Sequence, residues 1–161
     1  MMTTSSVFQV SEKKINPSKW ITEKDYQESD FRFIADSVES VNLRDRAELI
    51  SDLFRHCDGI TVNRDDSGDY FLQIKDKEDY FFGQFKLWKK SLKELMKLNL
   101  DDFTAPDGKL RSEMKRLNTK YSDSYGCYIQ SDNSFTTLND FVRNAKPDKK
   151  YYIGGAVTYN C

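Results

Sequence analysis

Apolar residues recur at helical spacing in three long stretches of the chain. In the stretch 43–57, Ile50, Leu53 and Phe54 share one face, and Asn42 supplies a favourable N-cap. In the stretch 77–98 the N-cap is Asp76, and one face carries Phe81, Phe85, Trp88, Leu92, Leu95 and Met96. The third stretch carries Leu110, Met114, Leu117 and Tyr121. We predict an amphipathic helix in each stretch.

Two shorter helices and one loop are predicted around them. Phe31, Ile34 and Val38 favour a helix over residues 30–39. Thr136 or Thr137 would cap a short helix that ends at Asn144. Residues 101–108 are predicted to form a loop.

A β-hairpin is the clearest strand signal. Residues 60–64 and 70–75 flank a turn at 65–69 that contains Gly68. Further strands are expected at 7–14, 125–130 and 150–159. The last crosses Gly154 and Gly155, which predicts a bulge or a close backbone approach. Residues 80–85 fit either a third strand or the start of the 77–98 helix, and their period leaves both open.

Together these elements predict an α+β fold. We expect a mostly antiparallel sheet of about four or five strands packed with about four or five helices. A chain of 161 residues fits a single small domain, 1–161, with a buried core. Residues 1–17 are expected to form an N-terminal strand or arm that is loosely attached.

Cysteine use and hydropathy bear on location. Cys57, Cys127 and Cys161 are odd in number and widely spaced, which favours reduced thiols and predicts a cytoplasmic protein. Purely apolar runs reach about three residues, whereas a spanning helix needs roughly 20, so no membrane segment is expected. The first residues lack the basic and apolar pattern of a signal peptide.

Charge is sorted along the chain, although the formal net charge is only −1. Residues 22–85 hold 16 Asp/Glu against 8 Lys/Arg, whereas residues 86–120 hold 10 Lys/Arg against 5 Asp/Glu. A surface dominated by one sign of charge attracts partners of the opposite sign. The sorting therefore points to binding without naming the partner.

The basic region supplies most of the candidate binding residues. At 100° per residue the 77–98 helix places its lysines in a stripe away from the apolar face, and the next helix extends this positive region. The candidates are Lys86, Lys90, Lys93, Lys97, Arg111 and Lys115. They could contact phosphates or an acidic protein, or they could be the solvated face of a helix.

Aromatic residues are too dense in the predicted strands for all of them to face inward. The set is Tyr70, Phe71, Tyr80, Phe81, Phe82, Tyr151, Tyr152 and Tyr159. Exposed tyrosines often anchor protein interfaces, so we predict a Tyr-rich binding surface that includes Tyr151 and Tyr152. The alternative is that these residues are divided between the core and ordinary surface.

An aspartate and a Gln-x-Lys motif lie on the two strands of the predicted hairpin. Asp58 opens the first strand, and Gln73-Ile74-Lys75 closes the second. This arrangement resembles the core of PD-(D/E)xK nucleases. The resemblance implies that Asp58 and the Ile74 carbonyl hold Mg²⁺ while Lys75 activates water. It is confined to residues 58–75, lacks the family's first strand, and leaves Gln73 without a charge for the metal.

Other catalytic or metal arrangements are weaker. His56 is the only histidine, and on a helix it points about 100° away from its neighbour Cys57. The cysteines lack the spacing of a zinc site. We therefore predict a non-catalytic binding protein without a cofactor. It would act through a charge-segregated, Tyr-rich surface, as do stoichiometric inhibitors that phages and mobile elements direct at host machinery.

The favoured partner is another protein. The alternatives are a metal-dependent nuclease that uses Asp58, Gln73 and Lys75 with Mg²⁺, and a nucleic-acid-binding accessory protein that uses the basic region. No membrane partner is expected. The sequence leaves the oligomeric state open.

Overall fold

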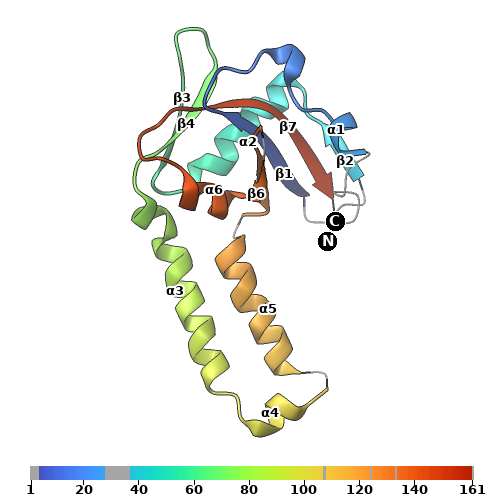
Figure 1. The fold of residues 1–161 in the computed structure, drawn as a ribbon, viewed down its shortest axis with the longest axis vertical. Coiled ribbons are helices and arrows are strands. Elements are labelled where there is room, and N and C mark those ends of the chain that lie inside the picture. The colour runs from blue at the N-terminus through green and yellow to red at the C-terminus, as the bar shows by residue number, and fades with distance from the viewer. Residues whose placement is uncertain (1–3, 28–36, 107, 124, 133, 161) are drawn as a thin grey trace.

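The computed structural model describes residues 4–27, 37–106, 108–123, 125–132 and 134–160. They form an α+β domain with a seven-stranded, mostly antiparallel sheet, which confirms the predicted class with more strands than expected. Figure 1 shows two helices projecting from this domain as an arm. The elements in chain order are β1 (Thr4–Ser11), η1 (Pro17–Lys19), α1 (Lys24–Gln27), β2 (Ser37–Ser40), α2 (Leu43–Arg55), β3 (Ile60–Arg64), β4 (Tyr70–Ile74), α3 (Lys77–Met96), α4 (Leu100–Thr104), α5 (Lys109–Ser122), β5 (Cys127–Gln130), β6 (Phe135–Thr137), α6 (Leu138–Asn144) and β7 (Tyr151–Asn160).

The sheet is organised around its first and last strands. Its strand order is β3-β4-β7-β1-β5-β6, and β2 pairs with the far end of β7. Only the β1–β5 pair is parallel among the described pairs. β1 therefore lies in the interior of the sheet, held by β7 on one edge and β5 on the other, rather than as a peripheral arm.

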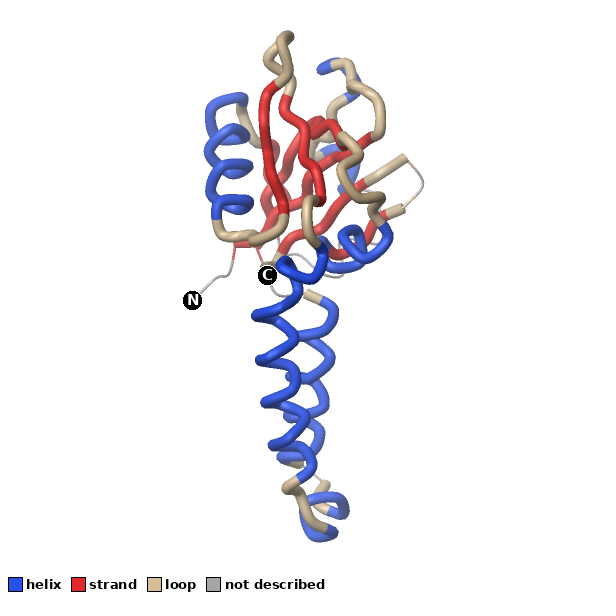
Figure 2. Tube along the Cα trace, turned by 90° about the vertical axis from the view of Figure 1, so that its left-hand side faces the viewer, coloured by secondary structure: helices blue, strands red, loops and turns tan. Residues whose placement is uncertain are grey.

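The two faces of the sheet are both covered. Successive residues of β1 point to opposite faces, so Phe8 joins the larger core and Val7 the smaller one. The larger core also holds Ile50 of α2 and Val142 of α6. Tyr26 of α1 packs with Val7 on the other face. Figure 2 shows α2 lying along the sheet while the arm extends away from it.

The helix caps predicted from the sequence are present. The side chain of Asn42 accepts a hydrogen bond from the Asp45 amide, and that of Asp76 accepts one from the Asp79 amide. Thr137 caps α6 in the same way. These caps fix where α2, α3 and α6 begin. The predicted hairpin is also confirmed, because β3 and β4 pair from Ile60 with Ile74 to Arg64 with Tyr70.

Several local predictions need correction. Residues 37–39 belong to strand β2, because β7 offers a free edge there, and the rest of the predicted 30–39 helix lies outside the described residues. Residues 80–85 are helical, which resolves the ambiguity left by their period. The predicted loop at 101–108 contains the short helix α4, which Asn99 and Asp102 stabilise with a capping box. β6 was not predicted.

The Gly154-Gly155 pair admits a close backbone approach, as predicted. A Cβ atom on Gly155 would lie 2.6 Å from the carbonyl oxygen of Ile21. Arg46 reaches the same region from α2 and donates hydrogen bonds to the carbonyls of Ile153 and Gly154, each at 2.7 Å. Its guanidinium also stacks 4.2 Å from the centroid of the Trp20 ring. These contacts fasten the segment before α1 to β7.

Candidate functional site

The projecting arm consists of α3 and α5, with α4 at its tip. The two helices pack against each other in antiparallel directions. Among the described residues, the arm meets the domain at its foot, where α3 and α5 contact α6. Figures 1 and 2 agree that most of the arm stands clear of the sheet. Surface residues on this arm are therefore open to a partner.

The most deeply buried residues in the seam between α3 and α5 are polar. Ser91 of α3 is 3% exposed and accepts a hydrogen bond from Lys120 of α5 at 2.7 Å. Glu113 lies on the same side of α5 as Lys120, is also buried, and pairs with Arg116 at 3.1 Å. Because the side chain of Ser91 is small, α3 and α5 can pack closely at this position. Consequently, much of the apolar surface of the arm lies beside the seam instead of within it.

Most apolar residues of both helices turn to one side of the arm. On α3, Phe85, Trp88 and Leu92 fall within about 60° of one another, on one side of Ser91. Leu110, Met114, Leu117 and Tyr121 share a comparable face of α5. Because the helices are antiparallel, both sets face the same way. We call this set, together with Met96, the arm face.

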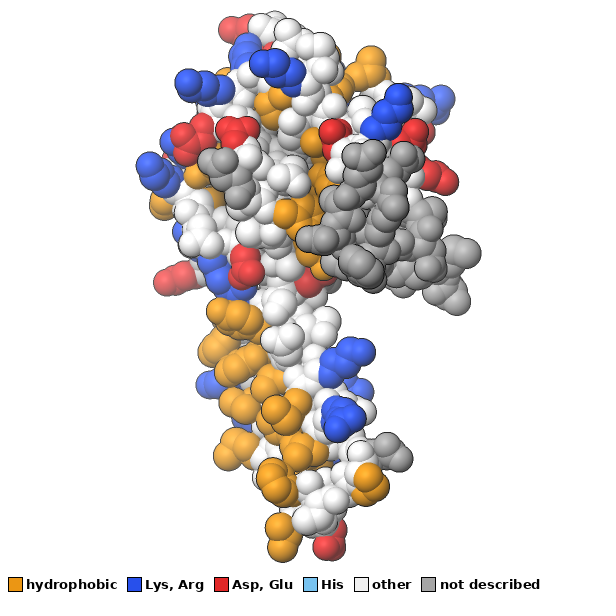
Figure 3. All heavy atoms as spheres, turned by 45° about the vertical axis from the view of Figure 1, so that its right-hand side comes forward, with side chains coloured by type: hydrophobic (Ala, Val, Ile, Leu, Met, Phe, Trp, Pro, Cys, Tyr) orange, Lys and Arg blue, Asp and Glu red, His pale blue; other side chains and the backbone are white. Residues whose placement is uncertain are grey.

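Much of the arm face is exposed to solvent. Phe85, Met114 and Tyr121 expose 52%, 56% and 53% of their surface, and Met96 exposes 77%. Leu100 and Phe103 of α4 are also exposed and extend apolar surface to the tip. Figure 3 shows hydrophobic side chains running along the arm. Large contiguous apolar patches of this kind mark interaction sites in soluble proteins.

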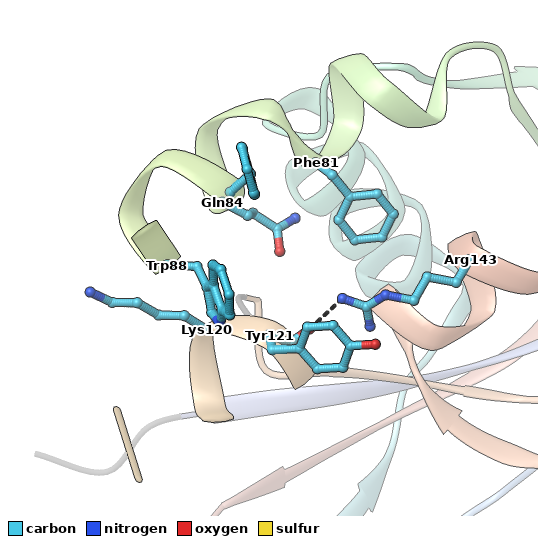
Figure 4. Close-up of a pocket in the computed structure, with 7 residues that line it drawn as sticks. Phe81, Gln84, Trp88, Lys120, Tyr121 and Arg143 are labelled. Atoms are coloured by element: carbon cyan, nitrogen blue, oxygen red, sulfur yellow. Dashed lines mark hydrogen bonds between the residues drawn. The ribbon is translucent and has the colours of Figure 1, made fainter. Parts of the chain in front are cut away.

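An open hollow lies on the arm face at the foot of the arm. Its volume is about 350 Å³, and its lining joins α3, α5 and α6 through Phe81, Gln84, Phe85, Trp88, Lys120, Tyr121 and Arg143. Figure 4 shows Phe81 and Gln84 above this space, Trp88 at its left and Tyr121 below it. Arg143 stacks 3.8 Å from the Tyr121 ring centroid and donates a hydrogen bond to the Tyr121 carbonyl at 2.7 Å.

A second hollow lies near the tip. Its volume is about 370 Å³, and it is lined by residues of α4, the following turn and α5, including Phe103, Pro106, Leu110 and Met114. Met114 and Tyr121 are seven residues apart on α5, so the two hollows are separated by about two helical turns, or roughly 10 Å. The arm face is thus hollowed at both ends.

Buried polar contacts hold the foot of the arm in place. Asn139 of α6 is 1% exposed and accepts a hydrogen bond from the Tyr80 hydroxyl at 2.8 Å. Its amide donates to Gln84 Oε1 at 2.7 Å and to the Tyr121 carbonyl at 3.2 Å. One side chain therefore connects α3, α5 and α6. Burial raises the pKa of the Tyr80 hydroxyl above its usual range, so this donor keeps its proton.

The six basic residues predicted to bind lie on the arm and are exposed. They are Lys86, Lys90, Lys93, Lys97, Arg111 and Lys115. The apolar side chains have cations close beside them, because the ammonium of Lys86 lies 4.2 Å from the Phe82 ring and that of Lys89 lies 5.3 Å from the Phe85 ring. Lys97 also pairs with Glu94 at 3.0 Å. A binding role for these cations stays a prediction.

The predicted tyrosine surface needs correction. Tyr151 is buried beneath α6, and its hydroxyl accepts a hydrogen bond from the Lys146 amide at 2.9 Å. Tyr152 is half-buried, with its ring centroid 5.9 Å from that of Phe71. Tyr80 and Tyr159 are also buried. These rings are packed inside the domain, and the aromatic residues that are most exposed within the described part of the chain lie on the arm instead.

The residues of the nuclease-like motif have other partners. Lys75 pairs with Asp148 at 2.9 Å, and the Gln73 amide donates to the Asp148 carbonyl at 2.8 Å. Asp58 is exposed in the turn between α2 and β3. Among the described residues, no group of three or more His, Cys, Asp or Glu is placed to hold a metal ion. The structure thus gives Gln73 and Lys75 a role in holding the loop before β7, and the nuclease hypothesis stays untested.

The described cysteines are free thiols in the core. Burial raises the pKa of the Cys57 thiol to about 11, and it also raises the pKa of the Cys127 thiol. The thiolate is the nucleophilic form, so both thiols are inert near neutral pH. His56 ends α2 as its C-cap and is exposed.

Sequence reasoning missed helix α4 at the tip of the arm and the hydrogen bonds of Asn139 and Arg143 at its foot. Phe103 was placed in a loop, Leu100 was not assigned to any element, and Asn139 and Arg143 carried no motif. A usable signal was present, because two apolar helical faces of similar length are separated by only about a dozen residues. That pattern is typical of a helical hairpin with a shared apolar side.

No family model matches the chain, and comparisons with curated proteins and with solved structures likewise give no match. No described helix combines the length and apolar character needed to cross a membrane.

Proposed function

We propose that this chain is a non-catalytic binding protein and that the helical arm is its contact element. The observation that carries the proposal is the exposure of Phe85, Met96 and Met114 on a projecting element whose seam is closed by polar residues. Apolar side chains that neither fill the seam nor meet the core contribute little to folding. Their burial against a partner would be favourable by roughly 25 cal/mol per Å².

A protein partner is favoured over a nucleic acid. Single-stranded nucleic acids bind to aromatic platforms, where bases stack. The arm face instead mixes Phe85 and Trp88 with aliphatic residues such as Leu92, Met96 and Met114. Aliphatic and methionine side chains suit the irregular apolar surface of another protein.

A stoichiometric inhibitor directed at host machinery is the specific form of this proposal. Such a protein needs a stable scaffold and one projecting surface that blocks its target. The sheet and its two cores supply the scaffold, and the arm supplies the projection. A scaffold with a projecting arm would also suit an assembly factor. Identifying the protein that the arm binds would distinguish an inhibitor from an assembly factor.

Site-specific photo-crosslinking tests the proposal. A photoreactive amino acid replaces Met114 on the arm face, and in a matched variant it replaces Thr119, which is exposed on the other side of α5. We expect one protein from the native host to crosslink through position 114 and not through position 119. Equal recovery from both positions, or from neither, would contradict a binding role for the arm face.

Two activity assays separate the alternatives. Mg²⁺-dependent cleavage of DNA or RNA that disappears in Lys75→Ala and persists in Phe85→Glu would replace the proposal with the nuclease. Salt-sensitive nucleic-acid binding that Lys90→Glu with Lys93→Glu weakens would favour the accessory protein. The proposal expects neither result.

A further inference from the structure

Building on the proposed function, we infer that the arm face receives an acidic amphipathic helix of the partner protein. The reasons are the shape of the face, its length and the charges at its edges. These properties also bear on the other possible occupants, which are a second copy of this chain, a membrane surface and a nucleic acid.

The shape of the arm face fits a helix. Two antiparallel helices present a shallow groove between their apolar rows, and a third helix can lay one apolar stripe into such a groove. The foot hollow between Trp88 and Tyr121 and the tip hollow beside Met114 are about two turns apart. Bulky side chains near positions i and i+7 of a partner helix match that spacing. A flat lipid surface would leave both hollows unfilled.

The length and area of the face are adequate for a specific complex. From Phe81 to Met96 the groove runs about 22 Å, which corresponds to about four turns of helix. Aromatic side chains offer about 150–250 Å² each, so the exposed residues of the arm face and tip provide several hundred Å². Standard interfaces bury about 800 Å² per partner.

The edges of the face are basic on both helices. Helical geometry places Lys89 and Lys93 beyond Phe85 on the outer side of α3, and Arg111 and Lys115 beyond Met114 on the outer side of α5. Residues 86–97 contain five lysines and one glutamate, and α5 contains five basic residues and one glutamate. An apolar stripe flanked by Asp and Glu complements this surface.

The same charges disfavour pairing between two arms. Two copies packed face to face would bring Lys and Arg of one arm against Lys and Arg of the other. Like charges at close range cost free energy and oppose association. Charge complementarity therefore selects an acidic helix over a second copy of this chain.

Binding of designed peptides tests the inference. The probe is a labelled amphipathic helix of about 20 residues with a leucine stripe and glutamates elsewhere. One comparison peptide carries lysine in place of glutamate, and another keeps the glutamates but carries serine in place of leucine. Anisotropy titrations should show that the acidic amphipathic peptide binds at least about tenfold more tightly than either comparison peptide.

A matched pair of variants locates the site. Phe85 and Leu87 lie on the same helix, are 52% and 54% exposed, and point about 160° apart, on nearly opposite sides. Phe85→Glu should weaken binding of the acidic peptide by about tenfold or more, whereas Leu87→Glu should change it by less than about twofold. Because both variants add one negative charge, a difference between them reports the position of the contact. Equal effects would overturn the proposed site.

Three further results would overturn the proposed occupant. The first is equal affinity for the acidic and basic peptides. The second is a concentration-dependent dimer that Phe85→Glu abolishes, which would assign the face to a second copy. The third is binding to phosphatidylserine vesicles, or to a single-stranded oligonucleotide, that exceeds peptide binding and is lost in Phe85→Glu.

The two proposals can fail separately. If position 114 crosslinks a host protein but the acidic peptide does not bind, the arm still binds a protein and the inferred chemistry of that partner is wrong. If neither experiment gives the expected result, the binding function is wrong as well.

Discussion

The hydroxyl of Tyr80 donates a hydrogen bond to the side-chain oxygen of Asn139 at 2.8 Å, and both residues are buried. Tyr80 lies in the first turn of α3, and Asn139 lies in α6. The contact therefore joins the foot of the arm to a helix of the core. An arm fixed in this way presents its apolar face with a defined orientation.

Replacing Asn139 with leucine should destabilise the protein. The Tyr80 hydroxyl would lose its partner at a buried site, which costs about 1–3 kcal/mol for an unsatisfied group, whereas the Tyr121 carbonyl would keep its hydrogen bond from Arg143. Chemical denaturation would measure this loss. Asn144→Ala is the control, because its side chain makes an exposed hydrogen bond at the end of the same helix, and it should change stability by less than about 0.5 kcal/mol. Equal losses of stability in the two variants would show that the buried hydrogen bonds of Asn139 contribute no more than the exposed one of Asn144.

Polar replacements on the arm face should leave stability nearly unchanged. Met96→Gln and Met114→Gln keep a straight side chain with similar helix propensity at exposed positions, so each should alter the free energy of unfolding by less than about 0.5 kcal/mol. Leu72→Ala in the core should cost about 2–5 kcal/mol. Urea denaturation compares the three variants. A large loss from either methionine would mean that the arm face supports the fold and is not reserved for a partner.

Replacing two glycines with alanine should change the stability of the protein in opposite directions. A Cβ on Gly83, within α3, meets no atom within 4 Å, so Gly83→Ala should stabilise the protein by about 0.5–1 kcal/mol. A Cβ on Gly155 would lie 2.6 Å from the Ile21 carbonyl, so Gly155→Ala should destabilise it by about 1–3 kcal/mol. Thermal unfolding measured on both variants checks the contrast. Stabilisation by Gly155→Ala would contradict the close packing of residue 21 on β7.

Stability should fall as the solution becomes alkaline. Burial raises the pKa of the Cys57 thiol from 9.0 to about 11 and the pKa of the Tyr125 hydroxyl from 10.0 to about 12. Above pH 9 the unfolded chain loses the Cys57 proton while the folded chain keeps it. Unfolding therefore releases a proton, and its free energy decreases with pH by up to about 1.4 kcal/mol per unit for each such group.

Denaturation series from about pH 8 to 11 measure this slope. Cys57→Ala removes one titrating group and should make the decline shallower above pH 9. A free energy of unfolding that stays constant over this range would show that the thiol is not buried as described.

The sequence alone was sufficient for elements that local patterns define. Asn42 and Asp76 marked the starts of α2 and α3 because a cap satisfies amide groups within its own first turn. The β3–β4 hairpin was equally local, since its turn contains Gly68 with a positive φ. The exposed positions of the six candidate cations could also be predicted, because helical spacing and charge are both visible in the chain.

Tertiary structure decided which side of each element is buried. The apolar rows of α3 and α5 predicted helices correctly, but helical period does not say whether such a row meets a core or solvent. Ser91 and Lys120 lie 29 positions apart in the chain but meet where α3 packs on α5, and Phe85 and Met114 stay exposed beside this contact. Tyr151 is the opposite case. Its ring was predicted from the sequence to lie on the surface, but α6 covers it. The amphipathic patterns were therefore local properties, whereas the exposed surface was fixed by contacts between distant residues.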